Sequence, residues 1–182
     1  LFLIILSSIF YIKITAQNQL HFKQLPQELG WSNYSIKDII QDEKGFLWIA
    51  SWHGLAKYDG YTIKKYFQSP KQKKGSSSNK IICLFKDSNN SIWVGTSYAG
   101  LYKYVPETDS FIQYANDATN SNSLSNNNVW SIAEDPNGHL WIGTQNGLNY
   151  FDPEKETFQQ FYHQPDQAWS LSNNFIYSLA VT

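Results

Sequence analysis

The fold is decided by the stretch Gly138-His139-Leu140-Trp141-Ile142-Gly143-Thr144, which is followed by Gly147-Leu148-Asn149-Tyr150. This stretch predicts a strand, a short turn and a second strand. Two earlier copies carry Trp48 and Trp93 in the place of Trp141, so the tryptophans recur 45 and 48 residues apart. A period of roughly 40–50 residues that contains several short apolar or alternating runs is typical of the blades of a β-propeller.

Each period contains four predicted strands, and the tryptophan lies in the second. The first strands, residues 36–40, 81–85 and 129–133, each lead to an aspartate that opens a four-residue turn. The last turn residue is Gly45, Asn90 or Gly138, and we expect a positive φ there, which glycine and asparagine tolerate best. The third strands begin at a glycine, and the fourth strands follow the pattern apolar-x-x-aromatic.

The sequence therefore predicts an all-β fold, a partial β-propeller with three complete four-stranded antiparallel blades at residues 35–67, 80–115 and 128–162. Two further stretches resemble isolated strands of the same pattern. Residues 20–25 match a fourth strand that would close a missing last blade, and residues 174–180 match the first strand of a fourth blade. We therefore expect residues 17–182 to be part of a longer propeller.

The chain starts with an apolar run, residues 1–12, which ends at Lys13 and leads to Thr15-Ala16-Gln17. This run is shorter than the roughly 20 residues of a membrane span and resembles the core of a secretory signal. We expect residues 1–16 to be a truncated signal peptide rather than a buried strand. The protein after it would then be exported to the periplasm.

Composition argues against several classes of function. The formal charge is −1, with 14 basic and 15 acidic residues, and every basic residue is a lysine. No basic run tracks a nucleic-acid backbone, and no arginine provides a bidentate phosphate contact. The four histidines lack metal-ligand spacing, and Cys83 is the only cysteine. We expect no catalytic site, no cofactor and no metal in this chain.

Small residues accompany the repeated tryptophans. Two positions after each tryptophan, on the same face of the strand, stand Ala50, Gly95 and Gly143. This pairing predicts that a neighbouring blade approaches closely, and that Trp48, Trp93 and Trp141 are core residues rather than platforms for a sugar. Cys83 aligns with Asp38, Ser131 and Ser178, which favours packing over a nucleophilic role.

Loop residues provide the candidate binding site. Exposed aromatic side chains and amides in the turns between second and third strands, and in the third inter-blade loop, suit carbohydrate because they offer an apolar platform with hydrogen-bonding groups. The alternative is that these are ordinary loop residues. The candidates are Trp52, His53, Tyr98, Gln145, Asn146 and Trp169.

The repeated pattern Asp-x-x-Gly-x-Leu-Trp-Ile-Gly-Thr-x-x-Gly-Leu-x-x-Tyr resembles the two-component regulator propeller repeat. Residues Asp135 to Tyr150 match it almost fully, whereas the first copy departs at Ala50 and Ser51 and the second at Asn90. The resemblance covers residues 20–180. It implies the periplasmic sensor half of a bacterial hybrid histidine kinase, whose two propellers, β-sandwich and membrane helix precede the kinase.

The resemblance implies a sensor, in many relatives a sensor of glycans, that signals as a homodimer through a downstream membrane helix. Its partners would be a glycan or another small extracellular ligand and the remaining blades of the parent chain, with no nucleic acid. The alternative is a secreted or surface propeller that binds a partner or acts as a carbohydrate-active enzyme or lyase, because fold alone does not determine function.

Overall fold

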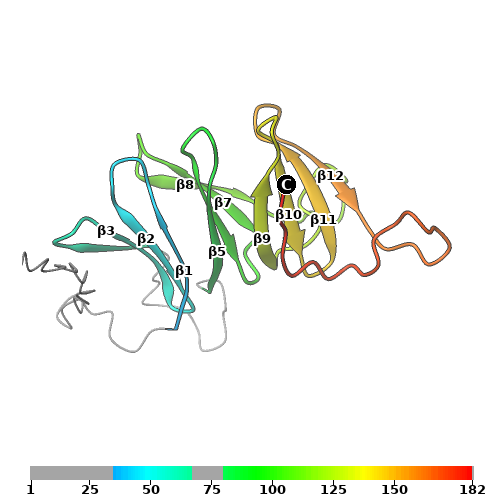
Figure 1. Ribbon diagram of the computed structural model, residues 1–182, viewed down its shortest axis with the longest axis horizontal. Helices are drawn as coiled ribbons and strands as arrows, with labels where there is room; N and C mark the ends of the chain where they lie inside the picture. Colours follow the sequence, from blue (N-terminus) through cyan, green and yellow to red (C-terminus); the bar gives the residue numbers. More distant parts are fainter. Residues whose placement is uncertain (1–34, 67–79, 182) are drawn as a thin grey trace, which may run out of the picture.

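The computed structural model describes residues 35–66 and 80–181, which form three four-stranded sheets arranged side by side in an arc (Figure 1). Strands follow in chain order within each sheet, and all neighbours are antiparallel. The all-β propeller architecture is thereby confirmed. The first blade contains β1 (Ile36–Gln41), β2 (Leu47–Ser51), β3 (Gly54–Tyr58) and β4 (Ile63–Tyr66); the second contains β5 (Ile81–Lys86), β6 (Ile92–Thr96), β7 (Leu101–Val105) and β8 (Ser110–Tyr114); the third contains β9 (Val129–Glu134), β10 (Leu140–Thr144), β11 (Gly147–Asp152) and β12 (Thr157–Phe161).

The turn between the first and second strands has the expected conformation in every blade. Its last residue has a positive φ in each case, 86° at Gly45, 63° at Asn90 and 84° at Gly138. The aspartate at its start accepts backbone N–H groups two and four positions later, as Asp87 does at 3.0 and 2.7 Å. Asparagine at Asn90 is therefore tolerated because the turn needs this conformation and asparagine adopts it more readily than most residues.

In the first two blades, the same aspartate also fixes the tryptophan. The indole N–H of Trp48 donates to Asp42 at 2.9 Å, and that of Trp93 donates to Asp87 at 2.8 Å. A buried indole N–H needs such an acceptor. The aspartate therefore orients the large side chain as well as forming the turn.

Neighbouring blades meet closely at the small residue that follows each tryptophan. A Cβ added at Gly95 would lie 2.8 Å from Cγ1 of Val129 in the third blade, and one added at Gly143 would lie 2.7 Å from Cγ2 of Ile176. Ala50, at the same place in the first blade, is fully buried. These residues are small because the next first strand, or the segment that follows β12, needs the space, as the sequence indicated.

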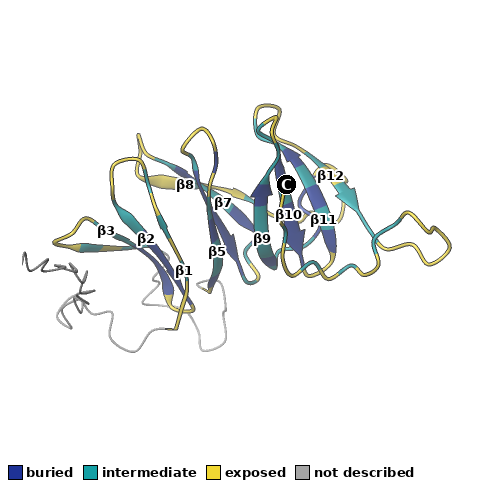
Figure 2. Cartoon of the chain, in the orientation of Figure 1, coloured by how far each residue is buried: buried dark blue, intermediate teal, exposed yellow. Residues whose placement is uncertain are grey.

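The core lies between the blades, where the strands in the middle of each sheet are buried (Figure 2). Trp48 and Trp93 have no exposed surface, which confirms their core role. Trp141 is half-buried, and its described ring contacts, to Tyr150 and Phe161, lie within its own blade. Trp48 and Trp93, by contrast, also contact rings of the following blade.

Strand register corrects the alignment of the third copy. Trp141 pairs with Tyr150, just as Trp48 pairs with Lys57 and Trp93 with Lys103. The residue equivalent to the repeat tyrosines at 58 and 104 is therefore Phe151. Tyr150 takes the lysine position, where its hydroxyl donates to Asp135 at 3.1 Å.

The inter-blade loop at residues 116–127 is partly a core element. Leu124 has no exposed surface and belongs to the cluster between the second and third blades. Ser125 is bound on both sides, because its N–H donates to Oδ1 of Asn149 at 2.8 Å and its hydroxyl contacts that of Thr144 at 3.0 Å. A single leucine anchors the polar loop in the blade interface.

The flanking segments differ from the complete blades. Residues 174–180 form no strand, although the N–H of Ile176 donates to the carbonyl of Thr144 at 3.0 Å. The segment is not a strand because no other strand pairs with it among the described residues, and a β-ladder needs two paired strands. The expected signal peptide at residues 1–16 and closing strand at residues 20–25 lie outside the described residues.

Candidate functional site

A β-bulge interrupts the first strand of every blade at the same place. The pairing skips one residue in each case, namely Lys37 in β1, Ile82 in β5 and Trp130 in β9. A bulged residue lies outside the regular alternation, so its side chain is re-aimed. Because β5 contacts both β1 and β9, the three bulges lie along one inner edge of the arc.

The re-aimed side chains line a hollow of about 380 Å³, which we call the inner hollow. Its walls come from all three blades and from the segment after β12. The lining residues are Lys37, Trp52, Lys80, Ile82, Ser97, Trp130 and Tyr177. A repeated backbone irregularity thus supplies one side chain per blade to a shared concave surface.

Trp52 forms the aromatic wall of the inner hollow on the side of the first blade. Its side chain is 45% exposed, whereas Trp48, four residues earlier, has no exposed surface. The Nζ atoms of Lys37 and Lys80 lie 4.1 and 5.5 Å from the Trp52 ring centroid. Such cation–π contacts hold the lysine stems and the indole together at the rim.

On the opposite side, Trp130 stacks on Tyr177 with ring centroids 5.4 Å apart and an interplanar angle of 25°. Phe175 extends this aromatic group, with its centroid also 5.4 Å from that of Trp130. The indole N–H of Trp130 is buried and meets no acceptor among the described residues. These rings give this side of the inner hollow a flat apolar surface.

The turns between the second and third strands differ in length, so the candidates in them do not occupy equivalent positions. Ser97 and Gln145 each donate a backbone N–H to the residue before the first strand, to Lys80 and to Asn128 respectively. They are therefore equivalent, and the residue aligned with Trp52 is Ser97 rather than Tyr98. Tyr98 is an inserted residue with φ of 80°, is 59% exposed and is not among the residues that line the inner hollow.

The remaining candidates are exposed but do not line the inner hollow. His53 follows Trp52, and its N–H donates to the Ser51 hydroxyl at 3.1 Å. Gln145 accepts a hydrogen bond from the amide of Asn128, and Asn146 lies beside it. Trp169 is 86% exposed on the loop after β12, at the end of the arc opposite the first blade (Figure 1). The structure thus brings Trp52 together with residues of the first strands, and keeps Trp169 apart.

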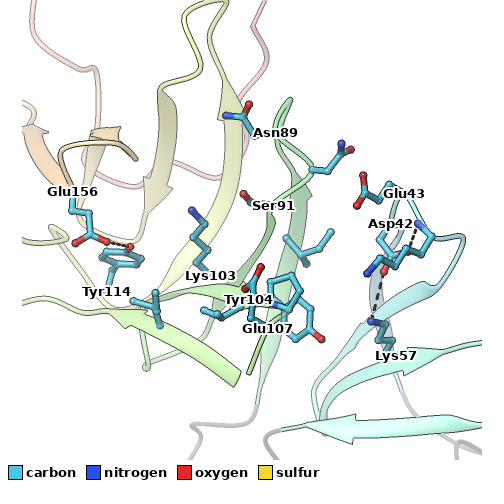
Figure 3. A pocket seen from close by; sticks show the side chains of 16 residues that line it. Asp42, Glu43, Lys57, Asn89, Ser91, Lys103, Tyr104, Glu107, Tyr114 and Glu156 are labelled. Carbon is cyan, nitrogen blue, oxygen red and sulfur yellow. Dashed lines mark hydrogen bonds and ion pairs between the residues drawn. The ribbon is translucent and has the colours of Figure 1, made fainter. Parts of the chain in front are cut away.

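A second hollow, the inter-blade hollow of about 440 Å³, lies between the first and second blades (Figure 3). Several of its polar groups bind each other or a neighbouring side chain. Asp42 binds the Trp48 indole and lies 3.8 Å from Lys57, and the hydroxyl of Tyr114 donates to Glu156 at 2.7 Å. These contacts hold neighbouring blades and turns in place, so we assign this hollow a structural role.

Cys83 lies within the blade packing. A Cβ on Gly95 would overlap its sulfur. Burial, with a smaller contribution from the Asp38 carboxylate, raises the pKa of the Cys83 thiol to about 12. A thiol held in its neutral form is a poor nucleophile. Within the described ranges, no group of three His, Cys, Asp or Glu side chains is placed to hold a metal ion.

Sequence reasoning missed six of the lining residues, namely Lys37, Lys80, Ile82, Ser97, Trp130 and Tyr177. A regular strand would direct Ile82 and Trp130 to the face opposite their neighbours, and no residue type in these strands marks a bulge. The available clue was periodic, because Ile82, Trp130 and Tyr177 occupy the same position of successive repeats at intervals of 48 and 47 residues.

The two-component regulator propeller family model matches three segments, residues 30–53, 75–98 and 123–146. Each of the three blades thus contains a segment that matches the two-component regulator propeller repeat. Each matched segment ends in the turn between the second and third strands, where the structure places Trp52, Tyr98 and Gln145.

The chain is similar to proteins of two-component signalling systems. The chain is 37% identical, over 124 residues, to the histidine kinase P4 of Formosa agariphila, a match that covers 66% of this chain and 9% of the kinase. It also resembles the extracellular domains of the two-component systems BT3049 and BT4673 of B. thetaiotaomicron. The first has a TM-score of 0.71, 30% identity and coverage of 85% of this chain and 22% of that domain; the second has a TM-score of 0.63, 27% identity and coverage of 82% and 19%. The chain spans less than a quarter of each relative.

Proposed function

We propose that this chain is part of the periplasmic ligand-sensing propeller of a hybrid two-component receptor. Its propeller repeats, its likeness to extracellular domains of such systems and its similarity to a histidine kinase support this role. The described residues include no helix long and apolar enough to cross a membrane. Membrane attachment, the kinase and homodimer formation belong to the parent receptor in this proposal.

The inner hollow is the ligand site of this proposal. The observation that carries it is the bulge in all three first strands, which turns Lys37, Ile82 and Trp130 toward one concave surface. Bulges are frequent beside functional sites because they re-aim side chains. A bulge repeated in each blade leaves ladder groups unpaired three times, and it directs side chains of all three blades to the hollow. The side chain of Trp130 also packs on Phe175 and Tyr177.

A carbohydrate suits this surface. The indole of Trp52 and the stacked pair Trp130–Tyr177 offer flat apolar faces for the C–H groups of a sugar ring. Ser97 contributes a hydroxyl group that can form hydrogen bonds. Ligand binding would shift the receptor between two arrangements, because a ligand changes an equilibrium by its differential affinity for the two states.

The test compares Trp52→Ala with Trp169→Ala in the full-length receptor. Oligosaccharides from galactan, arabinan, polygalacturonate and a sulfated galactan are titrated calorimetrically against each purified variant. We expect Trp52→Ala to weaken binding at least tenfold and to leave the melting temperature nearly unchanged, because the side chain is exposed. Trp169→Ala is the matched aromatic control on the distant loop.

Each outcome has a distinct meaning. Loss of binding in Trp52→Ala alone supports the inner hollow. Loss in Trp169→Ala alone moves the site to the loop after β12, and unchanged binding in both variants removes the site from these blades. If no saccharide binds the wild-type receptor, the assignment of carbohydrate as the ligand class is overturned.

A further inference from the structure

Two lysines give the inner hollow a positive charge. Lys37 is the bulged residue of β1, and Lys80 directly precedes β5. Their Nζ atoms lie 4.1 and 5.5 Å from the same ring centroid, that of Trp52. Neither lysine forms an ion pair with a described residue, so two ammonium groups stand beside one aromatic wall with no carboxylate between them.

This charge is local and does not follow from composition. The lining of the inner hollow has no acidic residue, although the whole chain has a formal charge of −1. The inter-blade hollow, in contrast, is lined by four carboxylates and three lysines, and Asp42 there is close enough to Lys57 to form an ion pair. The two hollows therefore differ in charge as well as in shape.

We propose that the inner hollow recognises an anionic saccharide. The sugar ring stacks on the aromatic side chains, and a carboxylate or sulfate oxygen binds the Nζ atoms of Lys37 and Lys80. Lysine is a compact point charge on a flexible stem, so it accepts either anion without the planar geometry that arginine imposes. This inference rests on the proposed function, since it takes the inner hollow as the ligand site.

The experiment separates charge from stacking in the full-length receptor. The probes are tetragalacturonate, a sulfated galactan oligosaccharide, the neutral galactan tetrasaccharide and inorganic sulfate. The variants are Lys37→Gln, Lys80→Gln and the control Lys86→Gln, which removes a lysine from the exposed end of β5. Affinities are measured by calorimetry at two salt concentrations.

We expect at least one anionic saccharide to bind and the neutral tetrasaccharide to bind at least tenfold more weakly. Lys37→Gln and Lys80→Gln should each weaken anionic binding about tenfold, the loss that follows from removing one charged hydrogen bond. Added salt should reduce the wild-type affinity and have less effect on the two variants. Lys86→Gln should bind like the wild type. Preference for the carboxylate or the sulfate probe identifies the source of the anion.

Other results overturn the inference in distinguishable ways. If the neutral tetrasaccharide binds as tightly as the anionic ones, and binding needs Trp52 but neither lysine, the proposed site stands and the charge assignment is wrong. If binding needs neither Trp52 nor the lysines, both proposals fail. Binding of inorganic sulfate as tight as that of the sulfated saccharide, or failure of every anionic saccharide to bind, also rejects an anionic saccharide as the ligand.

Discussion

The indole of Trp93 in the second blade meets the ring of Phe151 in the third edge to face, with centroids 5.7 Å apart and planes at 79°. Trp48 and Tyr104 repeat this contact between the first and second blades, at 4.6 Å and 63°. The aromatic core is thus shared between successive blades. A blade without its neighbour lacks half of the cluster around its tryptophan.

The contact between Trp93 and Phe151 should be energetically coupled. In the complete propeller, we expect a double-mutant cycle with Trp93→Leu and Phe151→Leu to give a coupling of about 0.5–1.5 kcal/mol, as for other edge-to-face pairs. Chemical denaturation measures the four free energies of unfolding. Tyr150→Leu is the control partner, because Tyr150 packs on Trp141 in the same blade and should not couple to Trp93. Equal coupling for both partners would contradict the assignment.

Gly95 should tolerate no side chain. A Cβ there would lie 2.8 Å from Val129 Cγ1 and would also overlap the sulfur of Cys83. We expect Gly95→Ala to lower the free energy of unfolding of the complete propeller by about 1–3 kcal/mol, the usual cost of overpacking. The additional change Val129→Ala should recover part of that loss. A melting temperature for Gly95→Ala at or above that of the wild type would show that the interface between the blades can accommodate the added methyl group.

Local rules made much of the fold predictable from the sequence. The Asp turn needs an acceptor at its start and a positive φ at its end, and both requirements can be read from a few adjacent residues. Asn90 satisfied the second requirement, with φ of 63°. Trp48 and Trp93 were recognisable as core because a small residue follows each on the same face, and Gly95 has the predicted close neighbour.

The sequence was less informative where contacts with another strand or blade determine the place of a residue in the fold. Tyr150 was aligned as the repeat tyrosine because of its residue type, whereas strand register assigns that place to Phe151. Leu124 was hidden in a polar loop, although its recurrence as Leu171 could have marked it as an anchor.

The ligand candidates show the same limit. Sequence reasoning selected Trp52 because it lies in a loop, but the side chains that join it in the inner hollow come from bulged strands. A bulge depends on how two strands pair, which residue types did not reveal here. Trp169 was grouped with Trp52 as an aromatic loop residue, but its loop, which follows β12, lies at the other end of the arc (Figure 1).

Tyr114 should strengthen the contact between the second and third blades. Its hydroxyl donates to Glu156 at 2.7 Å, and Glu156 lies in the turn before β12 with φ of 53°. We expect Tyr114→Phe to destabilise the complete propeller by about 1–2 kcal/mol, because a hydrogen bond to a charged group is lost. Tyr162→Phe is the control, since its hydroxyl donates to the neutral Gln160 at 2.9 Å and should matter less. Thermal melts that rank the two variants in the opposite order would argue against an inter-blade role for Tyr114.

Cys83 should make stability depend on pH in the alkaline range. Burial raises the pKa of its thiol from an ordinary 9.0 to about 12 in the folded protein. The folded state therefore retains a proton that the unfolded state loses above pH 9. The resulting stabilisation is complete below pH 9 and is lost as pH rises toward about 12.

We expect the free energy of unfolding of the complete propeller to fall more steeply between pH 9 and 11 in the wild type than in Cys83→Ser. Serine is a matched replacement because Ser131 occupies the same position in the third blade. Denaturant titrations at several pH values measure the two slopes, and the difference between them cancels the ionisation of tyrosines common to both proteins. At pH 8, alkylation of Cys83, followed by mass spectrometry, should be slow in the folded protein and fast in denaturant. Rapid alkylation of the folded protein, or equal slopes, would mean that the thiol is accessible and does not serve the blade packing.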